Sequence, residues 1–142
     1  MDSPGRSERL ELTVDAATAA ASAARFELVE WLEVNDADEV AVEELAVVIS
    51  ELVSNAVRAC RPGTNPSVSA WIEDEDVFLE VGNTLRPDAA AHTDWDLDDT
   101  LRHGGRGLLL VRAFVDDLEV EPDMSTEGVV FRCRRPLHST EA

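Results

Sequence analysis

The chain has 142 residues, of which 30 are acidic and 12 are basic, and its net charge at pH 7 is −18. This length fits one domain with one hydrophobic core, and a hydrophobic content of 44% excludes an intrinsically disordered chain. The negative charge argues against binding to nucleic-acid phosphates or to anionic membrane surfaces, because both require clustered Lys or Arg.

The N-terminal half of the chain predicts one strand and two helices. Apolar and polar residues alternate over 10–14, as is typical of a strand. Asp15 is placed to cap a helix that extends to about residue 33. A second helix is expected over 39–60, because apolar residues recur there every three or four positions, and Pro62 cannot continue it.

The C-terminal half predicts four strands and one more helix. The strands and the helix are expected over 67–72, 77–81, 108–116, 117–121 and 128–134. An acidic turn joins the first two of these strands. A long polar connection then extends to His103, and such a length inside a domain is typical of a functional or mobile loop.

This order of elements predicts a two-layer α+β sandwich, with helices on one face of a mixed, mostly antiparallel sheet. We expect one domain over 9–136, between flexible ends at 1–8 and 137–142. No apolar run reaches the ~18 residues of a membrane span, and the polar N-terminus is unlike a signal peptide. Cys60 and Cys133 are too few for a disulfide framework and wrongly spaced for zinc, so we expect a cytoplasmic protein with two reduced thiols.

The second predicted helix carries a carboxylate and an amide on one face. Glu51 and Asn55 are four residues apart, so their side chains lie about one turn apart on the same side. Both offer hard oxygen ligands of the kind that hold Mg²⁺ beside phosphates. The carboxylate can also accept a proton from an attacking hydroxyl. Taken alone, the pair also fits the solvated face of an ordinary amphipathic helix.

Glycines at the start of the third predicted helix indicate an anion site. Gly104, Gly105 and Gly107 allow backbone N–H groups to approach an anion, and the helix dipole favours negative charge there. Arg106 adds a candidate phosphate contact, and Leu108 begins the hydrophobic run of the helix. An ordinary Gly-rich turn remains the alternative for this segment alone.

Taken together with residues 81–87 at the end of a strand, these segments resemble the Bergerat-type ATPases, the superfamily of gyrase and the histidine kinases. Residues 51–56 are similar to the N-box, and residues 105–107 are similar to the second glycine box. The short chain, with no phosphoacceptor histidine helix before the N-box, resembles the bacterial anti-sigma-factor serine/threonine kinases. The resemblance covers residues 10–134.

The resemblance implies a site for ATP and Mg²⁺. It implies that Asn55 coordinates Mg²⁺, that Glu51 is the general base, and that Asn83 reads the adenine amino group. Residues 88–103 would form a lid over the nucleotide. The cofactor-binding residues that it implies are Asn55, Asn83, Gly104, Gly105, Arg106, Gly107 and Leu108.

The resemblance also implies protein partners. In that family the γ-phosphate of ATP is transferred to a serine of an anti-sigma antagonist protein. The same kinase sequesters a sigma factor, commonly as a dimer. We therefore expect a protein serine/threonine kinase that has a sigma factor and an antagonist as partners, and the resemblance allows a homodimer.

Two positions depart from the pattern of the first glycine box, where the family has Asp and then Gly two positions on. Asn83 keeps a hydrogen-bond acceptor but loses its charge, at a cost of about 1 kcal/mol. Leu85 would cost a further ~1–2 kcal/mol if it had to adopt a glycine-like backbone, but the loop can also take a path that needs no positive φ at this residue. We expect ATP binding that is weakened ~30- to 200-fold but not excluded.

Two other functions stay open at the level of the sequence. The first is a module of the same fold that has lost useful nucleotide affinity and acts only through protein contacts. The second is an unrelated enzyme that uses Glu51 and Asn55, although neither a metal-ligand cluster nor a nucleophile motif supports it.

Overall fold

The structure, a computed structural model, describes residues 9–17, 19–85, 106–123 and 128–138. Within these ranges the order of elements is strand, helix, helix, strand, strand, helix, strand, strand, as the sequence predicts. The elements are β1 (Leu10–Thr13), α1 (Ala20–Val34), α2 (Glu39–Ala59), β2 (Ser67–Glu73), β3 (Asp76–Thr84), α5 (Arg106–Phe114), β4 (Asp117–Asp123) and β5 (Gly128–Pro136).

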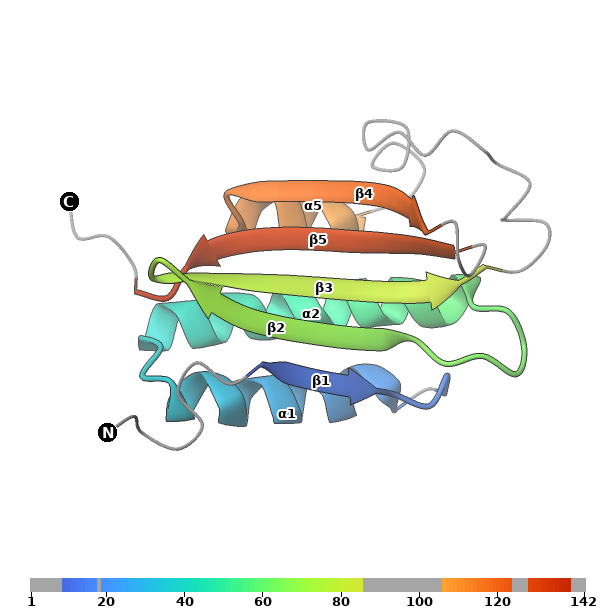
Figure 1. The fold of residues 1–142 in the computed structure, drawn as a ribbon, viewed down its shortest axis with the longest axis horizontal. Helices are drawn as coiled ribbons and strands as arrows, with labels where there is room; N and C mark the ends of the chain where they lie inside the picture. Colours follow the sequence, from blue (N-terminus) through green and yellow to red (C-terminus); the bar gives the residue numbers. More distant parts are fainter. Residues whose placement is uncertain (1–8, 18, 86–105, 124–127, 139–142) are drawn as a thin grey trace.

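The strands form one open sheet in the order β1-β2-β3-β5-β4. The helices α1, α2 and α5 lie on one face of this sheet, and no described helix covers the other face (Figure 1). The predicted two-layer α+β sandwich is therefore confirmed. Each neighbouring pair of described strands is antiparallel, so the sheet lacks the parallel pair that a mixed sheet would contain.

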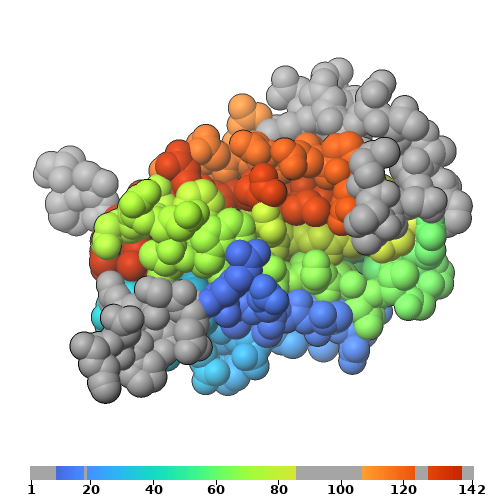
Figure 2. Space-filling model, viewed as in Figure 1, coloured from blue at the N-terminus to red at the C-terminus, as the bar shows by residue number. Residues whose placement is uncertain are grey.

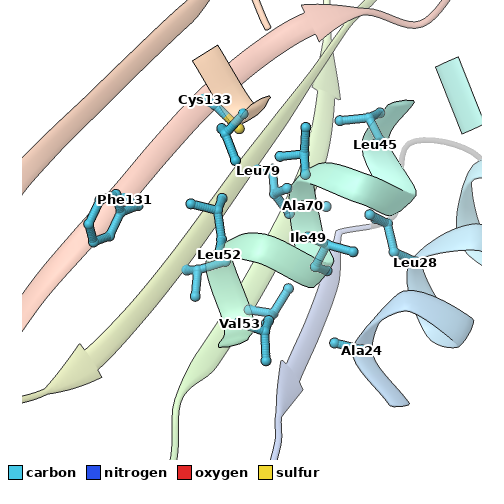
Figure 3. Close-up of a cluster of buried hydrophobic side chains, with 14 of the residues drawn as sticks. Ala24, Leu28, Leu45, Ile49, Leu52, Val53, Ala70, Leu79, Phe131 and Cys133 are labelled. Carbon is cyan, nitrogen blue, oxygen red and sulfur yellow. The ribbon is translucent and has the colours of Figure 1, made fainter. Parts of the chain in front are cut away.

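Helix α2 is the centre of the hydrophobic core. Its first turn is capped by Asp38, whose side-chain oxygen Oδ1 accepts a hydrogen bond from the Ala41 amide at 2.8 Å, a contact that typically contributes about 1 kcal/mol. Its apolar face packs between α1 and the sheet, where each fully buried large aliphatic side chain contributes about 1.5–3 kcal/mol. Figure 3 shows the packing of Leu45, Ile49, Leu52 and Val53 of α2 against Ala24, Leu28, Ala70, Leu79, Phe131 and Cys133.

Helix α1 begins later than predicted. Its N-cap is Ala19, which makes no side-chain capping hydrogen bond, so the expected cap at Asp15 was wrong. The amide of Val14 donates to the Pro66 carbonyl at 3.1 Å, and the amide of Ala16 donates to the Asn65 side chain at 3.1 Å. These two contacts hold the chain against the loop before β2, so the helix begins only beyond them.

The hairpin between β2 and β3 contacts the C-terminal end of the described chain. Its two turn residues, Asp74 and Glu75, have φ angles of 51° and 68°, as in a type I′ turn. The amide of Leu137 donates to the Glu75 carbonyl at 2.8 Å, and the carbonyl of Leu137 accepts from the Asp38 amide at 3.2 Å. The sequence placed Leu137 in a loose end, but its side chain is fully buried.

The face of the sheet opposite the helices is turned toward the viewer in Figure 2 and carries both aromatic and charged side chains. Trp71 and Phe78 stack on it with ring centroids 5.5 Å apart. Arg132 pairs there with Glu80, and Arg134 pairs with carboxylates of β3 and β4. Separately, none of the described helices is long and apolar enough to cross a membrane.

Candidate functional site

Three segments that are distant in the sequence meet at one end of the sheet: the C-terminal half of α2, the end of β3 and the start of α5 (Figure 1). Two of the contacts between them involve residues of the predicted site. Asn83 of β3 hydrogen-bonds to α2, and Gly107 of α5 touches Glu51 of α2. These are the segments whose motifs the sequence assigned to one site, so the fold places them together.

Part of the predicted site lies outside the described residues. This holds for Gly104, Gly105 and the lid expected over 88–103. The main chain of Arg106 begins α5, and its side chain is not among those described. Leu108 places its side chain in the core, where it is 1% exposed, so only its main chain is available to a ligand.

The side chain of Glu51 is half-buried between α2 and α5. A Cβ atom built on Gly107 would overlap Oε1 of Glu51 and would lie 3.3 Å from its Cδ. The carboxylate thus occupies the space that any side chain at position 107 would need. Glycine at this position thus allows the close approach of the two helices.

The side-chain oxygen of Asn55 already contacts a cationic group. Its Oδ1 accepts a hydrogen bond from Nη2 of Arg58 at 2.9 Å. This oxygen is the atom that the resemblance assigns to the metal ion. Sequence reasoning overlooked Arg58, although a basic residue three positions after Asn55 lies on the same helical face and was visible as such.

Asn83 points into the interface between β3 and α2. Its side chain is 9% exposed, and Nδ2 donates to the main-chain oxygen of Ala56 at 3.0 Å. Because a carbonyl oxygen can only accept, the amide nitrogen must face Ala56. The other amide atom, Oδ1, is therefore the one that can accept a hydrogen bond from a ligand.

Leu85 does not adopt the backbone conformation of a glycine. Among the described residues other than glycine, φ is positive only at Asp36, Asp74 and Glu75. Leu85 instead forms an antiparallel bridge with Cys60 at the end of α2, and its side chain is 2% exposed. The backbone cost of ~1–2 kcal/mol, which was conditional on a glycine-like conformation, therefore does not arise, because the chain leaves β3 along an extended path.

A protein-family model described as a histidine kinase-like ATPase domain matches residues 14–133. The chain belongs to the histidine kinase-like ATPase family. The match includes Asn55, and it includes Glu51, Asn83 and Gly107, whose contacts join the three segments.

Three solved structures are similar to this histidine kinase-like ATPase domain. The structure of the RsbU and RsbW domains of Rv1364c from Mycobacterium tuberculosis is 22% identical, with a TM-score of 0.69 over 91% of this chain, which spans only 32% of that protein. The SiaB–SiaC complex from Pseudomonas aeruginosa is 13% identical, with a TM-score of 0.58 and coverage of 89% and 88%. The catalytic domain of the histidine kinase ThkA is 14% identical, with a TM-score of 0.54 and coverage of 94% and 99%. At these identities the likeness is one of fold.

The described residues of the histidine kinase-like ATPase domain fit a magnesium nucleotide. Asn55 presents a hard oxygen that already binds a cationic group, and Asn83 presents an acceptor oriented by α2. In the part of the chain that the structure describes, no three His, Cys, Asp or Glu residues cluster so as to hold a metal. A magnesium ion at this site would thus be shared between Asn55 and the phosphates, as is common for nucleotide-bound Mg²⁺.

Proposed function

We propose that this histidine kinase-like ATPase domain binds Mg·ATP and transfers the γ-phosphate to a serine or threonine of a partner protein, as an anti-sigma regulatory kinase. The observation that carries the proposal is the meeting of Glu51, Asn55, Asn83 and Gly107 at one end of the sheet. The anti-sigma assignment is supported by the resemblance of the motifs and by the fold shared with the RsbW domain and with SiaB.

Each of these residues has a distinct part in the proposed reaction. Oδ1 of Asn83 accepts a hydrogen bond from the adenine amino group, and Oδ1 of Asn55 holds the metal ion. Bound ATP supplies the phosphoryl group. The Glu51 carboxylate takes the proton of the attacking hydroxyl as that oxygen bonds to the γ-phosphorus and ADP leaves.

The partners that we propose are a sigma factor and an anti-sigma antagonist, in the cytoplasm, with the kinase as a homodimer. The net charge of −18 favours basic patches on these partners. We therefore expect association to weaken as ionic strength rises.

The pure binding module is the less favoured alternative. Two departures from the family pattern, Asn83 and Leu85, were the arguments for it. The extended backbone at Leu85 removes the second argument. Asn83 still offers an acceptor oxygen.

The test has two steps. Calorimetric titration with Mg·ATP should give a dissociation constant in the micromolar to submillimolar range, and Asn55→Ala should abolish binding. Transfer of radiolabelled phosphate to the cognate antagonist should then be lost in Glu51→Ala and kept in Glu43→Ala, which changes an exposed carboxylate on the same helix. No binding at several millimolar ATP would overturn the proposal, and equal transfer by Glu51→Ala would remove Glu51 from the role of base.

A further inference from the structure

Gly107 and Glu51 approach each other more closely than two side chains could. Gly107 is the second residue of α5, and Glu51 lies in the middle of α2. The atoms of Glu51 nearest to a Cβ built at position 107 are Oε1, Cδ at 3.3 Å and Cβ at 3.7 Å. The carboxylate end of the glutamate is therefore the part nearest to this position, and Oε1 reaches furthest into the space where a Cβ would stand.

The backbone of Gly107 does not itself require glycine. Among the described glycines, only Gly63 has a positive φ, so Gly107 has a backbone that alanine can adopt. Within a helix, alanine normally stabilises a protein more than glycine does. For a domain of this size, the difference in free energy corresponds to a rise in melting temperature of about 3 °C. The geometry thus gives one reason for glycine at position 107: it leaves space for the side chain of Glu51.

The place that the carboxylate occupies also suits its charge. The first turn of α5 carries N–H groups without partners inside the helix, and the positive end of the helix dipole lies there. A carboxylate against this turn is held in place both by the space that Gly107 leaves and by the electric field of the helix dipole. A side chain at 107 would drive it away from α5.

We propose that Gly107 is a positioning residue for Glu51: by lacking a side chain, it fixes where the carboxylate lies against the first turn of α5. This rests on the proposed function, in which Glu51 is the base. Displacement of a base by about 1 Å typically costs up to a hundredfold in rate. We expect Gly107→Ala to lower the rate constant of phosphoryl transfer at saturating Mg·ATP by about 10- to 100-fold.

The experiment is a set of double-mutant cycles that first measures melting temperature, which requires no nucleotide. Gly107→Ala is introduced into the wild type, Glu51→Ala and Glu51→Gln. In the backgrounds with glutamate at 51, or with glutamine, which has the same length without the charge, the end of a flexible side chain must move, so we expect Gly107→Ala to raise the melting temperature by less than about 3 °C. In the Glu51→Ala background the overlap is absent, and we expect Gly107→Ala to raise the melting temperature by about 3 °C. The same shift in all three backgrounds would overturn the proposal.

The second cycle measures transfer at saturating Mg·ATP. If Gly107 acts through Glu51, Gly107→Ala lowers the rate constant in the wild type and has a much smaller effect in Glu51→Asp, which keeps a carboxylate on a shorter side chain and leaves room for a Cβ at 107. Losses that simply multiply would show that Gly107 acts on the nucleotide independently of Glu51, and would overturn the proposal. Failure of the protein to bind ATP would overturn the proposed function. The double-mutant cycle of melting temperatures would still test whether the Glu51 carboxylate lies against Gly107.

Discussion

Nη2 of Arg58 donates a hydrogen bond to Oδ1 of Asn55 at 2.9 Å, so a guanidinium lies on the oxygen that we propose as a metal ligand. A magnesium ion bound to the same oxygen would lie only a few ångströms from this charge, and like charges at such a distance repel. We therefore expect that Arg58 would have to leave this oxygen for Asn55 to hold a metal ion. In a chain with 30 acidic residues, the structure gives Arg58 no carboxylate partner among the residues it describes.

We expect Arg58→Ala to lower the Mg²⁺ concentration at half-saturation of ATP binding by about threefold to tenfold. The estimate corresponds to one exposed charge-assisted hydrogen bond that no longer competes with the metal ion. Calorimetric titrations with ATP at a series of Mg²⁺ concentrations measure this midpoint. Arg9→Ala is the charge-matched control, because Arg9 lies over the Trp71 ring on the opposite face of the sheet. An unchanged midpoint in Arg58→Ala would show that the contact does not compete with the metal ion.

Asn83→Asp restores the residue typical of the family, but we expect it to destabilise this chain by about 1–3 kcal/mol at pH 8. A carboxylate would place an oxygen against the Ala56 carbonyl, where the amide now donates. Burial and this repulsion would raise the pKa of the new carboxyl group, whose protonated form can donate to Ala56. The cost should therefore be small at low pH and should grow as pH rises through that pKa.

Urea denaturation of the Asn83 variants at pH 5 and at pH 8 measures this difference. Asn83→Ala is the control, since its loss of one hydrogen bond should be the same at both values of pH. A variant with Asp at 83 that is as stable as the wild type at pH 8 would show that Ala56 does not orient the side chain.

Leu85→Gly also restores a family-like residue, and we expect it to lower the free energy of unfolding by about 3–5 kcal/mol. The leucine side chain is 2% exposed, and its removal leaves a cavity where β3 meets the end of α2. Because Leu85 needs no glycine-like φ, the substitution relieves no backbone strain. Thermal denaturation checks the stability. A gain in Mg·ATP affinity in this variant would contradict the extended path of the chain.

Cys133 should make stability fall at alkaline pH. Burial raises the pKa of its thiol to about 12, whereas an unfolded cysteine ionises near about 8.5. A group whose folded pKa is raised contributes stability that is complete below the unfolded pKa. That contribution is lost as pH rises from about 9 toward 12, by up to ~1.4 kcal/mol per pH unit. Denaturation of the wild type and Cys133→Ala between pH 8 and pH 10.5 should show a steeper loss in the wild type, and parallel curves would contradict the burial of the thiol.

The order of the elements could be predicted from local pattern, because periodicity and turn residues act over a few positions. The buried stripe of α2 and the acidic turn at Asp74 are examples. The start of α1 could not be predicted in this way, because it depends on hydrogen bonds from Val14 and Ala16 to the loop before β2. Similarly, β3 extends to Thr84 because its last residues pair with β5, more than 40 positions later.

In the site, too, some features follow from local sequence and others depend on how the elements pack. Glu51 and Asn55 were visible from their spacing on one helix, and Gly107 from its place at a helix start. The contact of Gly107 with Glu51 joins two helices, and the orientation of Asn83 depends on a carbonyl of α2. Neither contact leaves a trace in the local sequence, because each depends on how the elements pack.

The position of Leu137 has a consequence for how the protein is made. This residue bonds both to the hairpin at Glu75 and to Asp38 at the start of α2, and its side chain is fully buried. β3 likewise gains its second neighbour only when β5 has been synthesised. The elements before β5 therefore keep an incomplete sheet during synthesis, and the core is complete only after the residues through Leu137 have been synthesised.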